Sequence, residues 1–208
     1  MTQYFFTPAG PDVRRQISAT IWGHKLSLTT STGVFSAGRL DPGTAVLLGR
    51  LDPPVAIPEN PAPRLLDLGC GFGPIALALA LACPKADVTA IDVNDRALEL
   101  TRLNAKTLGV PIQVMRPEEV PPDAQFDEIW SNPPIHVGKP ALHELLTTWL
   151  RRLSPGGRAY LVVQKNLGAD SLQTWLERAG WPTNRLASAK GYRILAIDSP
   201  PVEGWQRS

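Results

Sequence analysis

The possible folds of this chain are limited most by a strand, a glycine-rich turn and a helix in immediate succession. Residues 64–69 are a short apolar run that predicts a strand, and Pro74–Ala82 predicts a helix with proline at its favoured first position. Gly69, Gly71 and Gly73 lie at the junction. Glycines let the backbone turn tightly and approach a ligand, and the following helix offers its N-terminal N–H groups. The junction therefore predicts a ligand site at the carboxyl end of a strand.

The rest of the chain alternates between the two kinds of element. Further strands are predicted at 87–92, 112–116, 126–131 and 158–164, helices at Asp95–Leu108, 142–153 and 170–179, and a closing hairpin at 185–198. This order predicts a doubly wound, Rossmann-like α/β sheet that is mostly parallel, with the last strand antiparallel. Alternating apolar residues at 17–32 around Gly23 predict an N-terminal β-hairpin extension.

A proline-rich stretch at 52–63 predicts an extended connector. It divides the chain into an N-terminal hairpin and lid-like segment at 1–51 and a main domain at 64–208. A chain of 208 residues is long enough to bury a core without a metal or a disulfide. Cys70 and Cys83 alone make neither a disulfide framework nor a zinc site, so we expect no metal.

Composition excludes several classes of protein. The formal net charge is +2, which excludes a strongly basic coat protein. The longest apolar run, residues 75–83, is far too short to span a bilayer, and the first residues lack the pattern of a secretion signal. We therefore expect a cytoplasmic protein that has no membrane partner.

The second ligand-binding signal is Asp92, at the end of the second predicted strand and 19 residues after Gly73. A carboxylate there can accept hydrogen bonds from both hydroxyls of a ribose. Dinucleotide enzymes use the same geometry, but their G-x-G-x-x-G loop would need a glycine where this chain has Pro74. The glycine loop, rather than the acid, therefore separates the two kinds of cofactor.

The pattern D-x-G-x-G-x-G followed by the strand-two acid resembles class I S-adenosylmethionine (SAM) methyltransferases. The resemblance implies SAM as cofactor and S-adenosylhomocysteine as product. It places the glycine loop under the methionine moiety, the strand-two acid on the ribose and an acid after the third strand at the adenine. The cofactor-binding residues implied in this way are Asp67, Gly69, Cys70, Gly71, Gly73, Asp92, Val93, Glu118 and Asn132.

The chemical step is predicted at Asn132-Pro133-Pro134-Ile135, after the fourth strand of the main domain. Two prolines make a rigid loop, and the Asn132 amide oxygen and the Pro133 carbonyl can each accept one N–H of a planar exocyclic amine. Such acceptors aim the nitrogen lone pair at a methyl group, so that positioning and electrostatics carry the step. We predict Asn132, Pro133, Pro134 and Ile135 as the catalytic residues.

This tetrapeptide resembles that of amino-methyltransferases acting on adenine, guanine or glutamine nitrogens. The longer run N-P-P-I-H-x-G is similar to the RsmC-like ribosomal RNA guanine-N2 methyltransferases. Because Ile135 replaces the usual aromatic residue, another group must cover the base, and His136 and Phe35 are candidates. The run G-V-F-S-x-x-x-L-D-x-G-T resembles the segment that closes over the pocket in that group, which adds Arg39 as a substrate-binding residue and leaves Asp41 as a possible helix cap.

The charge is distributed unevenly, because residues 151–193 carry eight basic and two acidic side chains. This excess allows a basic face for RNA phosphates. The favoured function is transfer of a methyl group to guanine N2 of small-subunit ribosomal RNA, with that RNA or the small subunit as partner. The alternatives are the same chemistry on adenine, a protein glutamine or a small molecule, or a non-catalytic SAM- or RNA-binding module.

Overall fold

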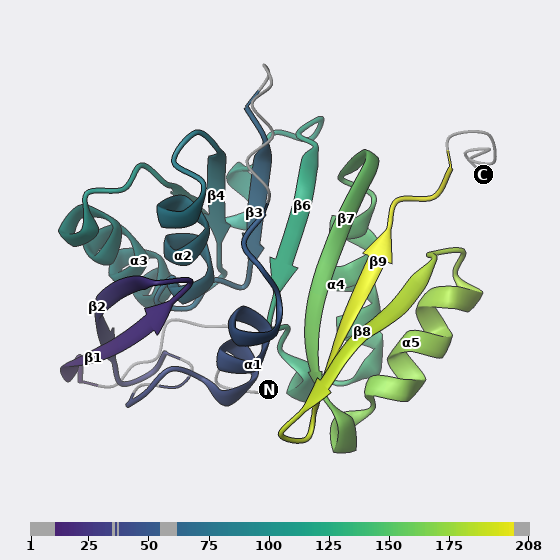
Figure 1. Cartoon of the computed structure of the whole chain (residues 1–208), viewed down its shortest axis with the longest axis horizontal. Helices are drawn as coiled ribbons and strands as arrows, with labels where there is room; N and C mark the ends of the chain where they lie inside the picture. Colours follow the sequence, from purple (N-terminus) through teal and green to yellow (C-terminus); the bar gives the residue numbers. More distant parts are fainter. Residues whose placement is uncertain (1–10, 35, 37, 55–61, 202–208) are drawn as a thin grey trace.

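The computed structural model describes residues 11–34, 36, 38–54 and 62–201. A seven-stranded sheet forms the centre, in the order β5-β4-β3-β6-β7-β9-β8 (Figure 1). Its strands are β3 (Arg64–Leu68), β4 (Asp87–Ile91), β5 (Gln113–Met115), β6 (Phe126–Ser131), β7 (Leu153–Gln164), β8 (Thr183–Ala189) and β9 (Tyr192–Asp198). All neighbouring pairs up to β6–β7 are parallel, and β9 runs antiparallel to both β7 and β8. The predicted doubly wound sheet with an antiparallel last strand is confirmed.

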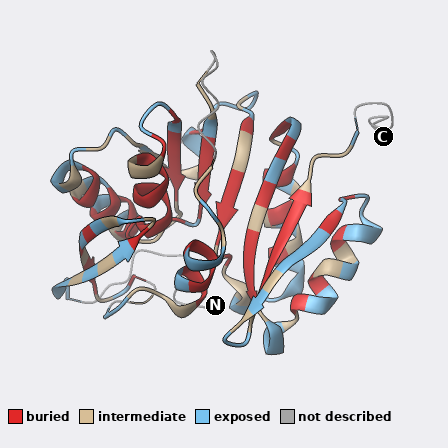
Figure 2. Cartoon of the chain, viewed as in Figure 1, coloured by how far each residue is buried: buried red, intermediate tan, exposed pale blue. Residues whose placement is uncertain are grey.

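Helices cover both faces of the sheet. They are α1 (Pro42–Arg50), α2 (Pro74–Ala82), α3 (Asp95–Leu108), α4 (Lys139–Leu150) and α5 (Ala169–Arg178), with short 3-10 turns η1 (Pro117–Glu119), η2 (Ile135–Val137) and η3 (Lys165–Leu167). Successive strand side chains point to opposite faces, and the core divides accordingly. Leu65 and Trp130 pack with α1, α2 and α3, whereas Leu66 and Ile129 pack with α4 and α5. The central strands are therefore buried on both sides (Figure 2).

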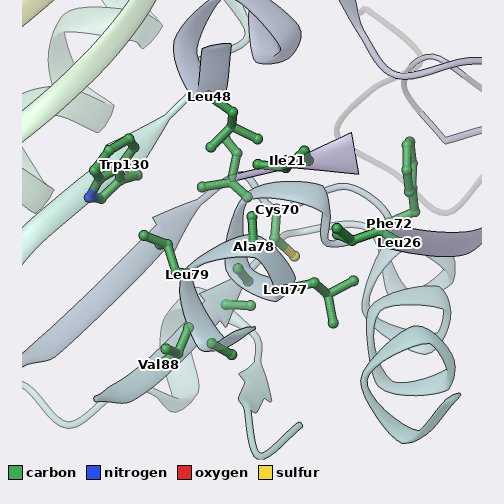
Figure 3. Packing of buried hydrophobic residues seen from close by; sticks show 14 of the residues in the cluster. Ile21, Leu26, Leu48, Cys70, Phe72, Leu77, Ala78, Leu79, Val88 and Trp130 are labelled. Atoms are coloured by element: carbon green, nitrogen blue, oxygen red, sulfur yellow. The ribbon is translucent and has the colours of Figure 1, made fainter. Parts of the chain in front are cut away.

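The predicted N-terminal hairpin is present as β1 (Arg14–Ile21) and β2 (His24–Ser31). Trp22 and Gly23 between the strands both have positive φ, as a two-residue hairpin turn requires. Leu26 of β2 and Ile21 of β1 pack into the same cluster as Leu77 of α2 (Figure 3). The hairpin therefore shares a core with the main domain. Residues 55–61 of the predicted connector lie outside the described residues, so the boundary at 52–63 stays a prediction.

Several element ends differ from the sequence-based expectation, among them helix α4, which spans Lys139–Leu150 instead of 142–153. Strand β7 begins at Leu153, because Leu153 pairs with Phe126 before a bulge carries the chain through Pro155 and two glycines to Arg158. Helix α1 begins at Pro42, because the Asp41 carboxylate accepts hydrogen bonds from the backbone N–H groups that follow it. Within the part of the chain that is described, no helix is long and apolar enough to cross a membrane.

Candidate active site

A cavity opens where the carboxyl ends of β3, β4 and β6 meet, at the same edge of the sheet. The N-terminal segment before α1 and the start of β9 complete its wall. In open α/β sheets this edge is where ligands bind. Its lining includes Val34, Asp41, Thr44, Gly69, Cys70, Gly71, Ile91, Asp92, Val93, Pro117, Asn132, Pro133, Pro134, Ile135, His136, Gln164, Leu167 and Tyr192. Most of the residues predicted from the sequence are thus brought to one cavity.

The glycine loop is held by backbone hydrogen bonds to the neighbouring strand. The N–H groups of Gly69 and Cys70 both donate to the carbonyl of Ile91, at 2.9 Å each. Gly73 has a φ of +91°, and a Cβ there would lie 2.9 Å from the Thr101 side chain, so both conformation and space require glycine. Gly73 does not line the cavity but begins α2, and it turns the chain from the loop into that helix.

Two buried polar residues of α3 support this loop from behind. Thr101 donates its hydroxyl to the carbonyl of Gly71 at 2.9 Å, and Asn104 donates to the carbonyl of Phe72 at 2.9 Å. Asn104 also exchanges hydrogen bonds with the backbone of Thr29 in the N-terminal hairpin. Sequence reasoning missed both residues. Their signal was a threonine and an asparagine on the otherwise apolar, buried face of a helix.

Asp92 carries the charge of this half of the cavity. One carboxylate oxygen accepts from the N–H of Gly71 and the other from the N–H of Asn94, both at 2.9 Å. Burial raises the pKa of Asp92, and hydrogen bonds from the backbone of Asn94, Gly71 and Val93 oppose the rise. Each oxygen keeps a second lone pair, so the carboxylate can still accept two hydroxyl groups from a ligand in the cavity.

Asp67 and Cys70 lie beneath the loop. Asp67 is fully buried, and one carboxyl oxygen accepts from the N–H of Ala76 in the first turn of α2 at 2.9 Å. Burial raises the pKa of Asp67 to about 7, against the hydrogen bond from Ala76, and the charge of Asp92 adds to the rise. The pKa of the buried Cys70 thiol is also raised by burial. Asp67 therefore supports the loop from within and does not line the cavity, whereas Cys70 does.

Asn132 lies at the opposite side of the cavity, directly after β6. The Ser131 hydroxyl fixes the end of this strand by donating to the carbonyl of Leu68 in β3 at 2.6 Å. The Asn132 side-chain NH2 donates to Asp41 at 2.6 Å and to the Thr44 hydroxyl at 3.1 Å. No described residue donates to the Asn132 amide oxygen or to the Pro133 carbonyl. Both predicted amine acceptors are therefore available at the cavity wall.

The other predicted site residues take different places. Pro134, Ile135 and His136 line the cavity with Pro133, in a loop that closes through a hydrogen bond from Val137 to the Pro134 carbonyl. Val93 lines it beside Asp92.

Besides Asp67 and Gly73, the predicted residues Glu118 and Arg39 do not line the cavity. Glu118 is exposed and forms an ion pair with Arg116, and its neighbour Pro117 lines the cavity instead. Arg39 is exposed on the segment before α1. Phe35 lies outside the described residues. Roles at the adenine and at the target base remain predictions for Glu118, Arg39 and Phe35.

The C-terminal hairpin supplies residues that the sequence did not reveal. Tyr192 begins β9 and, with Gln164 at the end of β7, lines the cavity. A Cβ on Gly43 would lie 3.0 Å from the Tyr192 ring and 3.0 Å from the Asp41 carboxylate, so α1 packs closely against this wall. Burial and the charge of Asp41 raise the pKa of Tyr192. Tyr192 thus adds an aromatic ring to the cavity wall, which has isoleucine at position 135.

Among the described residues, no group of three or more His, Cys, Asp or Glu side chains could hold a metal ion. The cavity presents a glycine-rich loop and the Asp92 carboxylate on one side, and the Asn132 amide beside two prolines on the other.

Comparison with known proteins agrees with this arrangement. The model of the methyltransferase small domain family matches residues 25–196. An uncharacterised protein of Bacillus subtilis, YbxB, is 29% identical over 94% of this chain and 98% of its own length. Ribosomal RNA small subunit methyltransferase C of Pseudomonas aeruginosa is 34% identical over 91% of this chain and 57% of its own length.

The structure of the T. thermophilus 16S rRNA N2 G1207 methyltransferase RsmC, in complex with AdoMet and guanosine, is also similar. It superposes with a TM-score of 0.77 at 28% identity, over 92% of this chain and 52% of that chain. The chain thus spans little more than half the length of the RsmC proteins that it matches.

Proposed function

Because this chain belongs to the methyltransferase small domain family of class I SAM-dependent methyltransferases, we propose that it methylates guanine N2 in small-subunit ribosomal RNA. The observation that carries the proposal is the Asn132 amide, which lines the same cavity as Asp92 and is held by its NH2 group, while no described residue donates to its oxygen. One side of the cavity suits a nucleoside cofactor and the other an amine.

The residues around the glycine loop fit SAM. Asp92 has two carboxylate oxygens for the ribose hydroxyls, and Gly69 and Gly71 bring bare backbone to the cavity beside it. Pro117, Ile91 and Val93 provide apolar surface on the far side of Asp92, where the adenine would lie. An adenosine moiety needs acceptors for its ribose hydroxyls and apolar surface for its purine ring, and this part of the cavity offers both.

SAM supplies a methyl group on a sulfonium, which is a good leaving group, so the chain needs no strong base. Asn132 Oδ1 and the Pro133 carbonyl each accept one N–H of the target amine. This pairing holds the amino group with its nitrogen lone pair directed across the cavity. The proton that the nitrogen loses passes to one of these acceptors or to water. Catalysis is thereby assigned to orientation and electrostatics, which together are worth many orders of magnitude in rate.

Guanine in ribosomal RNA is favoured as substrate by the rim of the cavity. Lys139 follows the Pro-Pro loop, Lys165 follows Gln164 and Lys190 lies in the hairpin turn before Tyr192, and all three side chains are exposed. Three separate segments thus carry an exposed cation within a few residues of the cavity lining, which suits RNA phosphates. The similar RsmC structure contains guanosine and AdoMet, which supports the same target. An enzyme of ribosomal RNA would act in the cytoplasm.

The test is methyl transfer from radiolabelled SAM to naked ribosomal RNA and to small subunits, both from a strain that lacks this gene, followed by nucleoside analysis. We expect label in N2-methylguanosine, and much slower labelling with Asn132→Ala. Label in N6-methyladenosine would keep the mechanism and overturn guanine as target. No label in any RNA, with SAM binding measured in the same preparation, would overturn the RNA proposal and leave peptides and small molecules to be tested.

A further inference from the structure

Asp41 joins two elements that are far apart in the sequence. One of its carboxylate oxygens accepts from the N–H groups of Gly43 at 2.7 Å and Thr44 at 3.0 Å, which caps α1. The same oxygen accepts from the side-chain NH2 of Asn132 at 2.6 Å, across 91 residues of sequence. Thr44 adds a second acceptor for that NH2 group at 3.1 Å. A helix cap therefore also serves as a partner for the proposed catalytic amide.

The chemistry of this contact selects one orientation of the amide. An ionised carboxylate has acceptors only, so it can pair with the NH2 end of Asn132 and not with its oxygen. Turning the amide over would place the Asn132 oxygen against the carboxylate oxygen at hydrogen-bond distance and lose the hydrogen bond to Asp41, whereas the Thr44 hydroxyl can pair with either end of the amide.

We propose that Asp41 is a positioning residue, which fixes the Asn132 amide with its oxygen directed to the target amine. This inference rests on the proposed role of Asn132.

The packing around the contact supports this role. A Cβ on Gly43 would lie 3.0 Å from the Asp41 oxygen and 3.3 Å from the Asn132 nitrogen, so the contact is closed on this side. Charge-assisted hydrogen bonds in such partly buried places are stronger than neutral ones. The pair is thus built to hold one geometry.

The segment before Asp41 is also tied to the cofactor side of the cavity. Asn94 donates from its side chain to the carbonyl of Gly33 at 3.0 Å, and Arg96 donates to the carbonyl of Thr32 at 2.8 Å. Asn94 in turn pairs through its backbone with Asp92. The segment from Thr32 to Asp41 is therefore held at both ends. Its first residues contact Asn94, which pairs with Asp92, and its last residue contacts Asn132.

Three variants test the proposal. Asp41→Ala removes the cap and the contact. Asp41→Asn keeps an oxygen for both and loses only the charge. Trp22→Phe is the matched control, because Trp22 donates to the carbonyl of Leu51 at 2.8 Å and stabilises the opposite end of the same helix without lining the cavity.

The first readout is the side-chain amide signal of Asn132 in the 15N–1H spectrum, assigned by its loss in Asn132→Ala. It needs no substrate. We expect this signal to shift and to exchange with solvent faster in Asp41→Ala, and to stay as in wild type in Trp22→Phe. An unchanged signal in Asp41→Ala would overturn the proposal.

The second readout is single-turnover methyl transfer on whichever RNA the wild type methylates. We expect Asp41→Ala to lower the rate by about 10- to 100-fold at saturating SAM, with SAM affinity unchanged, as a misplaced catalytic group does. Asp41→Asn should restore most of the rate. In the Asn132→Ala background Asp41→Ala should have no further effect, because the two act as one unit.

Equal losses in both backgrounds, or a loss in Trp22→Phe as large as in Asp41→Ala, would assign Asp41 to helix stability alone. If the wild type methylates no RNA, the proposed function fails, while the amide signal still decides the role of Asp41.

Discussion

The two sides of the cavity are built in different ways. The side proposed for the cofactor, around the glycine loop and Asp92, comes from the adjacent strands β3 and β4. Its contacts are backbone hydrogen bonds such as those from Gly69 and Cys70 to Ile91. The amine side is assembled from three distant parts of the chain, and its contacts are between side chains, as between Asn132 and Asp41. The first is a property of chain conformation and the second of tertiary packing.

Because their contacts differ, the two sides should respond differently to amino-acid substitution. A loop held by backbone geometry depends on residues that permit that geometry, such as Gly73, and on the carboxylate it surrounds. A side chain held by another side chain depends on the partner's charge and position. Substitutions on the cofactor side should therefore affect binding and folding, whereas those on the amine side should affect chiefly the rate, with a loss of stability where the residue also caps a helix, as Asp41 does.

The largest effect is expected for Asp92→Ala. It removes two hydrogen bonds to ribose and the partner of the Gly71 N–H, so SAM affinity should fall by about 10³-fold, since bonds to charged groups contribute about 1.5–3 kcal/mol each. Isothermal titration with SAM measures it. Asp87→Ala, at the exposed start of the same strand, should leave the affinity within a factor of two or so of wild type. Equal affinities for the two variants would remove Asp92 from the cofactor site.

The next effect concerns the loop itself. Gly73→Ala meets both a positive φ and the Thr101 side chain, and should lower the free energy of unfolding by about 3 kcal/mol. Gly180→Ala is matched, because Gly180 has a similar φ of +87° but open space around its Cβ position. Urea unfolding should show a clearly smaller loss for Gly180→Ala, and identical losses would argue against close packing of α3 on the loop.

A third effect is a pH dependence of stability that arises beneath the cofactor side. The pKa of Asp67 is about 7 in the folded chain, above its ordinary value near 3.8, so the folded state retains a proton that the unfolded state has lost. Stability should therefore fall as the pH rises from about 4 to about 7, by about 2–3 kcal/mol between pH 5 and 7.5.

Urea unfolding of the wild type and Asp67→Asn at both pH values isolates this contribution. The variant should lose the Asp67 part of the dependence, so the stability of the wild type relative to the variant should rise by about 2–3 kcal/mol from pH 7.5 to pH 5. Parallel curves would show that Asp67 is ionised in the folded chain at pH 5.

The smallest effect is expected at the rim. Lys165→Ala and Lys190→Ala should each weaken RNA binding by a few-fold and reduce the slope of log affinity against log salt by about one. Lys85→Ala is the control, because Lys85 is exposed before β4, at the opposite edge of the sheet. Filter binding at several salt concentrations would distinguish the two variants from the control. An unchanged slope in both variants would show that the RNA backbone does not contact Lys165 or Lys190.

The sequence predicted the fold and most of the cavity because the relevant signals are local. The glycine loop, the acid at the end of β4 and the tetrapeptide after β6 each lie within one strand-to-loop junction, and parallel strands bring such junctions to one edge. Helix α3 could likewise be bounded by its cap Asn94 and by Gly109 in the left-handed conformation.

The remaining contributions depend on contacts that no local pattern encodes. Asp41 could be identified as a helix cap from its own neighbours, but its contact with Asn132 exists only once α1 packs against β7 and β9, beside the loop that follows β6. The entry of Tyr192 into the cavity follows from the pairing of β9 with β7. Asn104 resembles any polar helix residue until the N-terminal hairpin meets it at Thr29.

The most direct test that one side of the cavity binds the cofactor and the other carries out the chemical step uses Asn132→Ala. SAM affinity and single-turnover methyl transfer are measured in the same preparation, with Asn184→Ala on the exposed edge of β8 as control. We predict SAM affinity within about 3-fold of wild type and a rate lower by about 10³-fold, since the lost contact matters only to the reacting amine. A wild-type rate in Asn132→Ala would contradict the assignment of Asn132 to the chemical step.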